Sequence, residues 1–337
     1  MAERVHLEGI YKENIHKESH EEGGELRHQA WLALDTATAN MTVAVMRGLD
    51  VIAGNESAVE RNHSVRLVPE IQDLLRQAGI RMRDIRAIAI GRGPGSYTGV
   101  RIGVTVGKTL AWSLGVPIVS VSSTGALAFG YVRESQPEGL TWIVPMLDAR
   151  RRQVFTGLYA WADDPEADVP DAALMPDPVR PAQPDAMRPA DAPAIAGHAA
   201  AQDGADADGF PDGEAETIRF AESGLSGTWK LLAKDRIVLF ADWAAQLCRA
   251  LQSMPEPKRP KRIVFVGETD AFREDASSLH ERTGVPVLIA NQYVHARDIA
   301  CLAWNRLLRK EADDVHGLVP NYTQLAEAEQ KLLSRQT

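Results

Sequence analysis

Hydrophobic residues in the first part of the chain change their spacing several times, from short runs and alternation to the three- and four-residue spacing of an amphipathic helix. Runs and alternation are typical of strands, and the longer spacing is typical of helices that pack one face on a sheet. The pattern predicts strands at Trp31–Asp35, Met41–Arg47, Val51–Val59, Ile85–Ile90 and Pro117–Val121, and helices at His63–Gln77, Ser96–Leu114 and Ser122–Arg133. The turns between the first three strands are short, so these strands are expected to form an antiparallel meander.

A similar order begins again after residue 136. The pattern predicts strands at Thr141–Leu147, Gln153–Trp161, Trp229–Lys234, Arg262–Val266 and Val285–Ile289, with helices at Ile237–Leu251 and Ala296–Arg309. A three-strand meander followed by alternating helices and strands is the ribonuclease-H-like order. We therefore expect an α/β protein with two ribonuclease-H-like lobes and a cleft between them. The first lobe is predicted at 29–135, the second at 136–317, and a C-terminal tail at 318–337.

Two further segments fall outside this pattern. Residues 1–28 are polar and predict an extension outside the fold. Residues 162–227 contain nine of the nineteen prolines and few large apolar side chains, and we expect this insert to be disordered. Residues 163–217 carry fourteen acidic side chains and two arginines, so the net charge of −9 hides a mildly basic remainder. That remainder is compatible with RNA or with an acidic partner, and it selects neither.

The chain shows no signal for a membrane or for export. No apolar run reaches the roughly 18 residues of a membrane helix, and residues 1–28 lack the apolar core of a signal peptide. Cys248 and Cys301 lie in apolar helical patterns and are interpreted as reduced core residues. These features predict a cytoplasmic protein without membrane contact.

The segment Gly91–Gly103 has the sequence Gly-Arg-Gly-Pro-Gly-Ser-Tyr-Thr-Gly-Val-Arg-Ile-Gly, between a predicted strand and a predicted helix. Ser96 stands at the helix N-cap, where exposed amides suit an anion, and Gly115 is expected to end the helix. Within the helix, Gly99, Gly103 and Gly107 recur every four residues and form one bare stripe. Each glycine costs a helix about 1 kcal/mol relative to alanine, so something must approach the stripe closely. Three uses stay open: a phosphate loop, close packing on the lobe's own sheet, and contact with a partner helix.

Five segments together resemble the TsaB (YeaZ-type) family. They are Leu34–Thr38, Arg61–Ser64, Gly91–Gly103, Leu147–Arg150 and Pro320–Tyr322, and they occur in this order. The resemblance extends from about Trp31 to Leu333 apart from the insert, and the glycine-rich block is highly specific. Residues Pro320–Gln324 depart from the Tyr-Leu-Arg common at that place in the family, which puts in doubt any role that the arginine carries.

The resemblance implies a fold of the actin/Hsp70/sugar-kinase (ASKHA) superfamily and a function without catalysis of its own. It implies a non-catalytic subunit that scaffolds and activates a TsaD-type transferase and, through that pair, engages a TsaE-type ATPase. The assembled proteins transfer a threonylcarbamoyl group to adenosine 37 of tRNA. No cofactor is expected to bind tightly to this chain, and ATP or ADP is expected only in the complex.

In active members of the superfamily, two acid-bearing turns hold Mg²⁺ and phosphates across the cleft. Asp35 and Asp148 occupy the equivalent strand ends, but Arg150 stands where the second turn normally has a glycine. An arginine obstructs close approach of the backbone to a phosphate, although its charge suits an anion. The candidate phosphate or nucleotide residues are Asp35, Thr36, Gly93, Gly95, Ser96, Thr98 and Arg150. The presence of Asp35 and Asp148 keeps open an alternative function, an independent ATP-dependent small-molecule kinase.

Metal chemistry has little support in the sequence. The resemblance implies that the TsaD-type transferase carries a His-x-x-x-His helix, whereas His63 of this chain is followed four residues later by Leu67. No His-Glu-x-x-His motif occurs, so the histidine spacing does not support a metallopeptidase and no metal site is predicted.

The family is thought to pair through helices of the first lobe, and this implies an interface on the two helices at 63–77 and 96–114. The expected interface residues are His63, Val65, Leu67, Val68, Gly99, Arg101, Gly103 and Gly107. A homodimer of the isolated chain through the same helices stays open. The tRNA is expected to bind through the complex, with Arg150–Arg152 as the better candidate for direct contact.

Overall fold

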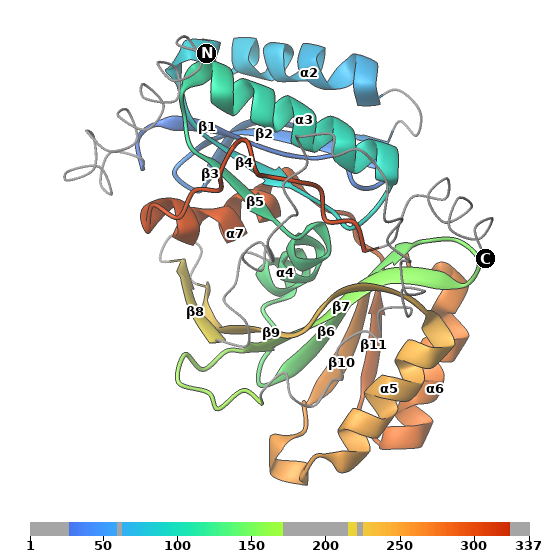
Figure 1. The fold of residues 1–337 in the computed structure, drawn as a ribbon. Helices are drawn as coiled ribbons and strands as arrows, with labels where there is room; N and C mark the ends of the chain where they lie inside the picture. Colours follow the sequence, from blue (N-terminus) through green and yellow to red (C-terminus); the bar gives the residue numbers. More distant parts are fainter. Residues whose placement is uncertain (1–26, 59–62, 171–214, 221–224, 324–337) are drawn as a thin grey trace, which may run out of the picture.

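Two β-sheets, one in each lobe, lie one above the other with helices between and outside them (Figure 1). The computed structural model describes residues 27–58, 63–170, 215–220 and 225–323. The predicted extension at 1–28 lies almost entirely outside the described residues, as do residues 171–214 of the predicted insert and the end of the tail.

The first sheet has the strand order β3-β2-β1-β4-β5. Its strands are β1 (Ala30–Asp35), β2 (Asn40–Arg47), β3 (Asp50–Ala58), β4 (Ile85–Gly91) and β5 (Ile118–Val121). β1, β2 and β3 form the predicted antiparallel meander, whereas β4 and β5 run parallel to β1.

The second sheet repeats this order and adds a strand, as β11-β10-β6-β7-β9-β8. Its strands are β6 (Thr141–Asp148), β7 (Gln153–Ala162), β8 (Ala215–Phe220), β9 (Leu225–Leu239), β10 (Arg262–Gly267) and β11 (Val287–Ala290). The two sheets confirm the predicted α/β fold with two ribonuclease-H-like lobes.

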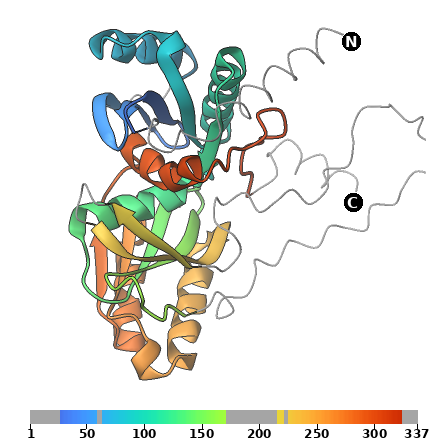
Figure 2. The same cartoon turned by 90° about the vertical axis from the view of Figure 1, so that its left-hand side faces the viewer.

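Helices cover both faces of each sheet because the central strands are buried on both sides. α2 (His63–Gln77) and α3 (Tyr97–Leu114) pack side by side on the outer face of the first sheet. α7 (Ala296–Leu308) covers its inner face, and α4 (Ser123–Ser135) packs beside α7 and covers the inner face of the second sheet (Figure 2). α5 (Phe240–Ser253) and α6 (Arg273–Thr283) cover the outer face of the second sheet. Short 3-10 turns lie at Met82–Asp84, Glu256–Lys258 and Asp270–Phe272.

α7 corrects the predicted lobe boundary. The sequence assigns this helix to the second lobe, yet it packs against β1, β2, β4 and β5 of the first sheet. Trp304 stacks on Trp31 of β1 at 5.6 Å between ring centroids, and the Ala296 amide donates to Thr42 Oγ1 at 2.9 Å. Nearness along the chain therefore did not decide which sheet the helix covers. The apolar face of α7 completes the core beneath the first sheet.

The predicted insert is also shorter than 162–227. β8 lies inside that range and pairs with the beginning of β9, so the prediction of disorder is wrong for both segments. Residues 163–170 are held as well, since the Val169 carbonyl accepts from Lys230 Nζ at 3.0 Å and the Val169 side chain is buried. β9 begins at Leu225, but the hydrophobic pattern before Trp229 is too weak to predict a strand there.

None of the helices in the described part of the chain is long and apolar enough to cross a membrane.

Candidate interlobe cleft and docking surface

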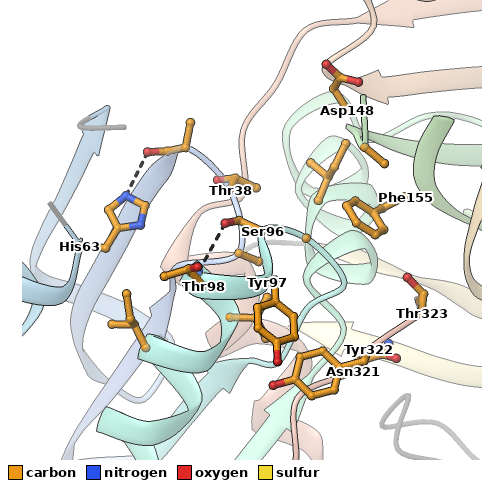
Figure 3. Close-up of a pocket in the computed structure, with 18 of the residues that line it drawn as sticks. Thr38, His63, Ser96, Tyr97, Thr98, Asp148, Phe155, Asn321, Tyr322 and Thr323 are labelled. Atoms are coloured by element: carbon orange, nitrogen blue, oxygen red, sulfur yellow. Dashed lines mark hydrogen bonds between the residues drawn. The ribbon is translucent and has the colours of Figure 1, made fainter. Parts of the chain in front are cut away.

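A cavity of about 800 Å³ lies between the lobes, where the N-terminal ends of α2 and α3 face the ends of β6 and β10 (Figure 3). The first lobe contributes the turn after β1, the first residues of α2 and the first turn of α3. The second lobe contributes the end of β6 with its turn, Phe155 of β7 and Glu268 after β10. The C-terminal segment adds Asn321, Tyr322 and Thr323. The predicted cleft between two lobes is therefore present.

The glycine-rich loop is bound to its own lobe on both sides. A Cβ atom at Gly95 would lie 2.3 Å from the Ala37 carbonyl oxygen, so only glycine allows this approach. The Ser96 amide donates to the same carbonyl at 2.7 Å, and Ser96 Oγ caps α3 by accepting from the Gly99 amide at 3.4 Å. On the other side, the Gly93 amide donates to Ser123 Oγ at 3.0 Å. The predicted N-cap at Ser96 and the C-cap at Gly115, with φ of 66°, are confirmed.

Asp35 does not face the cavity. Its side chain is completely buried, with Oδ1 accepting from the Ala37 amide at 2.7 Å and Oδ2 accepting from the Ser123 hydroxyl. Burial raises the pKa of Asp35 above its ordinary value, although the hydrogen bonds from Ser123 and Ala37 act in the opposite direction. A Cβ at Gly91 would lie 1.7 Å from Asp35 Oδ2, so the backbone of β4 closes the remaining side.

Three of the candidate phosphate residues are therefore corrected: Asp35, Thr36 and Gly93 are absent from the cavity wall. Thr36 is also fully buried, and its hydroxyl donates to the Gly99 carbonyl at 2.7 Å. Where the loop packs onto the end of β1, the Asp35 carboxyl group and the Thr36 hydroxyl are already hydrogen-bonded within the lobe, and a phosphate or Mg²⁺ would need these groups. Gly95, Ser96, Thr98 and Arg150 do line the cavity.

The second acid-bearing turn is open to solvent. Asp148 is exposed, its Oδ1 accepts from the Arg150 amide at 2.7 Å, and its own amide donates to Glu268 Oε2 at 2.7 Å. Burial raises the pKa of Glu268, and the neighbouring Asp148 carboxylate adds to this, whereas the hydrogen bond from the Asp148 amide lowers it. Within the described ranges, no group of three or more His, Cys, Asp or Glu side chains is placed to hold a metal ion.

The three arginines of this turn have an unusual backbone. Arg150, Arg151 and Arg152 all have positive φ, at 65°, 52° and 64°. This left-handed conformation is normally taken by glycine, so the turn holds three bulky side chains on a backbone that favours glycine. Arg152 Nη2 bonds Asp275, and its guanidinium lies over the Phe272 ring at 5.4 Å. Arg150 remains exposed at the cavity.

The glycine stripe of α3 faces its own sheet. Cβ atoms at Gly99, Gly103 and Gly107 would lie 2.1 Å from Thr36 O, 2.4 Å from Thr36 Oγ1 and 2.6 Å from Ile90 Cγ2, respectively. The expectation that these glycines meet a partner is therefore wrong, and close intramolecular packing explains them. Leu67 is corrected in the same way, because it is fully buried in the core between α2 and the sheet.

The remaining expected interface residues do lie on the surface. Val65 is 71% exposed and Val68 is 42% exposed, and Arg101 is exposed on the neighbouring helix. His63 is partly buried at the start of α2, where its Nε2 lies 3.1 Å from the Ala39 carbonyl oxygen. These four residues and Tyr97 belong to the N-terminal halves of α2 and α3, and we call this surface the α2/α3 face.

Several cavity residues were not singled out as site residues from the sequence. Glu268 and Phe155 gave no signal, because Glu268 follows an ordinary strand pattern of the second lobe and Phe155 lies within one. Tyr97 and Tyr322 lay within the recognised segments, and their rings stack at 5.1 Å between centroids. The two rings lie beside each other in the close-up of Figure 3. Only the tertiary structure brings these two tyrosines together, because one begins α3 and the other lies in the C-terminal segment.

Comparison with known proteins gives a consistent set of relatives. A family model described as TsaD, tRNA N6-adenosine threonylcarbamoyltransferase, matches residues 56–332. The tRNA threonylcarbamoyladenosine biosynthesis protein TsaB of Bacillus subtilis (strain 168) is 31% identical over 306 residues, which is 90% of this chain and 98% of that protein. TsaB of Escherichia coli (strain K12) is 39% identical over 128 residues, 38% of this chain and 54% of that protein. Among solved structures, YeaZ from Pseudomonas aeruginosa covers 87% of this chain and is itself covered to 99%, with 21% identity and a TM-score of 0.53.

Proposed function

The chain belongs to the TsaB (YeaZ-type) family, and from this premise we propose that it acts in the formation of N6-threonylcarbamoyladenosine in tRNA. Its role in this proposal is that of a non-catalytic subunit. It docks on a TsaD-type transferase through the α2/α3 face and activates that subunit for transfer of the threonylcarbamoyl group to adenosine 37.

The observation that carries this proposal is the exposure of apolar side chains on the α2/α3 face. Val65 and Val68 lie one helical turn apart on α2, and Tyr97 on α3 is 42% exposed. Scattered apolar residues are normal on a surface, but a cluster bordered by charged residues is typical of a protein interface. Arg66, Glu70 and Arg101 supply polar groups around this cluster.

The geometry of the cleft supports a role without phosphoryl transfer. Asp35 is sealed behind Gly91 and Ser123, and so it cannot reach a metal or a phosphate without opening the loop. On the facing turn, the Arg150 side chain occupies the place where the superfamily brings its backbone to a phosphate. The alternative, an independent ATP-dependent kinase, is therefore not favoured.

The remaining partners follow from the same proposal. A TsaE-type ATPase and the tRNA would bind to the assembled pair, and ATP or ADP would be held there without a tight site in this chain alone. A homodimer of the isolated chain would use the same face. The protein would act in the cytoplasm.

The decisive experiment replaces the apolar residues of the α2/α3 face. Val65→Asp with Val68→Asp is expected to weaken binding to the co-purified TsaD-type subunit at least tenfold and to reduce tRNA modification in a reconstituted assay. Val51→Asp is the matched control, because Val51 is 43% exposed on β3, away from this face. Equal partner affinity for the double variant and the control would refute the docking surface. ATP hydrolysis or sugar phosphorylation by the chain alone would refute the non-catalytic role.

A further inference from the structure

The C-terminal segment reaches the α2/α3 face through a chain of three side chains. Tyr322 stacks on Tyr97, with the two rings inclined by 29°. Tyr97 then holds Arg101, because Arg101 Nη1 donates to Tyr97 Oη at 2.9 Å and its guanidinium lies 5.2 Å from the centre of the Tyr97 ring. Tyr322 therefore restricts the ring that orients the guanidinium.

The position of Tyr322 depends on both lobes. The Asn321 amide donates to the Arg92 carbonyl of the glycine-rich loop at 2.8 Å. Its side-chain amide donates to Asp235 Oδ2 of β9 at 3.0 Å. Upstream, Lys108 Nζ donates to the Leu318 carbonyl at 2.6 Å, which fastens the segment along α3. These hydrogen bonds anchor the C-terminal segment and so place Tyr322 at the α2/α3 face.

Arg101 has no acidic partner among the described residues. Its contacts there are the Tyr97 ring and hydroxyl, and no carboxylate oxygen lies within 4.0 Å of its guanidinium. An arginine held in one orientation has already lost much of its rotamer freedom, so pairing with a carboxylate then costs less entropy. The guanidinium and the exposed valines of α2 share the N-terminal half of the two helices.

We propose that Tyr322 is a positioning residue for partner docking: through Tyr97 it holds Arg101 ready to pair with a carboxylate of the TsaD-type subunit. The inference rests on the proposed function and adds a contribution from the C-terminal segment, which lies more than 200 residues from the docking helices in sequence. The group that pairs with Arg101 is a protein carboxylate, because the arginine lies beside apolar residues, and these fit a protein surface better than the phosphate backbone of a nucleic acid.

A double-mutant cycle tests this coupling. Equilibrium affinity for the TsaD-type subunit is measured for the full chain and for Tyr322→Ala, Arg101→Ala and the double variant. We expect Tyr322→Ala to weaken binding three- to tenfold, Arg101→Ala to weaken it about tenfold, and the double variant to bind no more weakly than Arg101→Ala. Tyr322→Phe keeps the ring and should remain within twofold of the wild type. Tyr293→Ala is the control, since Tyr293 is 58% exposed away from this face.

The outcomes separate the inference from the proposed function. If the unaltered chain fails to bind the TsaD-type subunit, the proposed function fails. If it binds and Tyr322→Ala binds equally well, or if the two substitutions are additive, the positioning role is refuted. A loss confined to self-association, measured by sedimentation, or to tRNA affinity in Arg101→Glu would assign the arginine to another occupant and overturn the inference. Thermal unfolding of each variant checks that the fold is unchanged.

Discussion

The two lobes end their first strands with an aspartate at the same topological place, yet the two residues have opposite surroundings. Asp35, at the end of β1, is completely buried and accepts hydrogen bonds from Ala37 and Ser123. Asp148, at the end of β6, is exposed at the cavity and accepts from the Arg150 amide. A repeated sheet therefore preserves the position of an acid without preserving its chemistry.

The neighbours of each aspartate explain the difference. In the first lobe, Gly91 and Ser123 bring β4 and α4 against the carboxyl group, which becomes part of the core. In the second lobe, the left-handed turn at Arg150–Arg152 follows the aspartate, and the Asp148 side chain stays exposed. Neither turn combines an exposed carboxylate with a glycine at the following turn positions: Asp35 is buried, and Asp148 is followed by Arg150–Arg152.

The largest effect is expected from Gly91→Ala. A Cβ atom there would lie 1.7 Å from Asp35 Oδ2 and 2.8 Å from Ser123 Oγ, so the buried network must break. We expect the free energy of unfolding in urea to fall by about 3 kcal/mol or more. Gly79→Ala is the control, because nothing lies within 4 Å of that Cβ and only the positive φ of 67° acts, for about 1 kcal/mol. Equal losses would mean that Asp35 can vacate this space.

The next largest effect is expected from replacing the two aspartates one at a time, because only Asp35 is buried. Asp35→Ala leaves Ser123 and the Ala37 amide without their buried acceptor, and should lower the free energy of unfolding by about 2–3 kcal/mol. Asp148→Ala removes an exposed acceptor and should change it by less than about 1 kcal/mol. Urea unfolding of both variants at neutral pH measures the difference. Similar losses would contradict the contrast between a core carboxyl group and a surface one.

The burial of Asp35 should also appear in the pH dependence of the free energy of unfolding. Because burial raises the pKa of Asp35 in the folded state, the native protein holds that proton more tightly than the unfolded chain. The contribution of Asp35 to stability is fully present below its unfolded-state pKa of 3.8, and it is lost as the pH rises through its folded-state pKa. We expect stability to fall less steeply above pH 3.8 in Asp35→Asn than in the wild type, measured by urea unfolding at a series of pH values. Parallel curves would show that Asp35 contributes no proton linkage.

The smallest effect, of opposite sign, is expected in the second turn. Arg150→Gly and Arg151→Gly relieve a left-handed backbone and should each raise the free energy of unfolding by about 0.5–1 kcal/mol. Arg81→Gly is the control, because Arg81 has φ of −89° and gains nothing from glycine. Calorimetric titration with Mg·ATP should detect no binding by Arg150→Gly, since Asp35 stays buried. Binding by that variant would show that the arginine alone blocks the site.

Local patterns in the sequence were enough to predict most elements. The strand-and-helix order, the Ser96 cap and the Gly115 stop depend on residues that are neighbours in the chain, where periodicity and capping act directly. Predictions that depended on distant packing were less accurate. α7 covers the first sheet instead of the second, and its own pattern does not show which sheet its apolar face will meet. β8 pairs with β9, its neighbour in the chain, but it lies in a proline-rich and acidic segment whose composition predicted no strand.

The candidate site divides along the same line. The sequence by itself determined the family motif, the spacing of the glycines on α3 and the absence of a paired histidine four residues after His63, because each is a matter of residue type and period. Only the tertiary structure decided which way the glycine stripe faces, that Asp35 and Leu67 are buried, and that Tyr322 meets Tyr97. The physical reason is that burial and contact belong to pairs of segments, and a single helix or strand pattern cannot state which partner its face will meet.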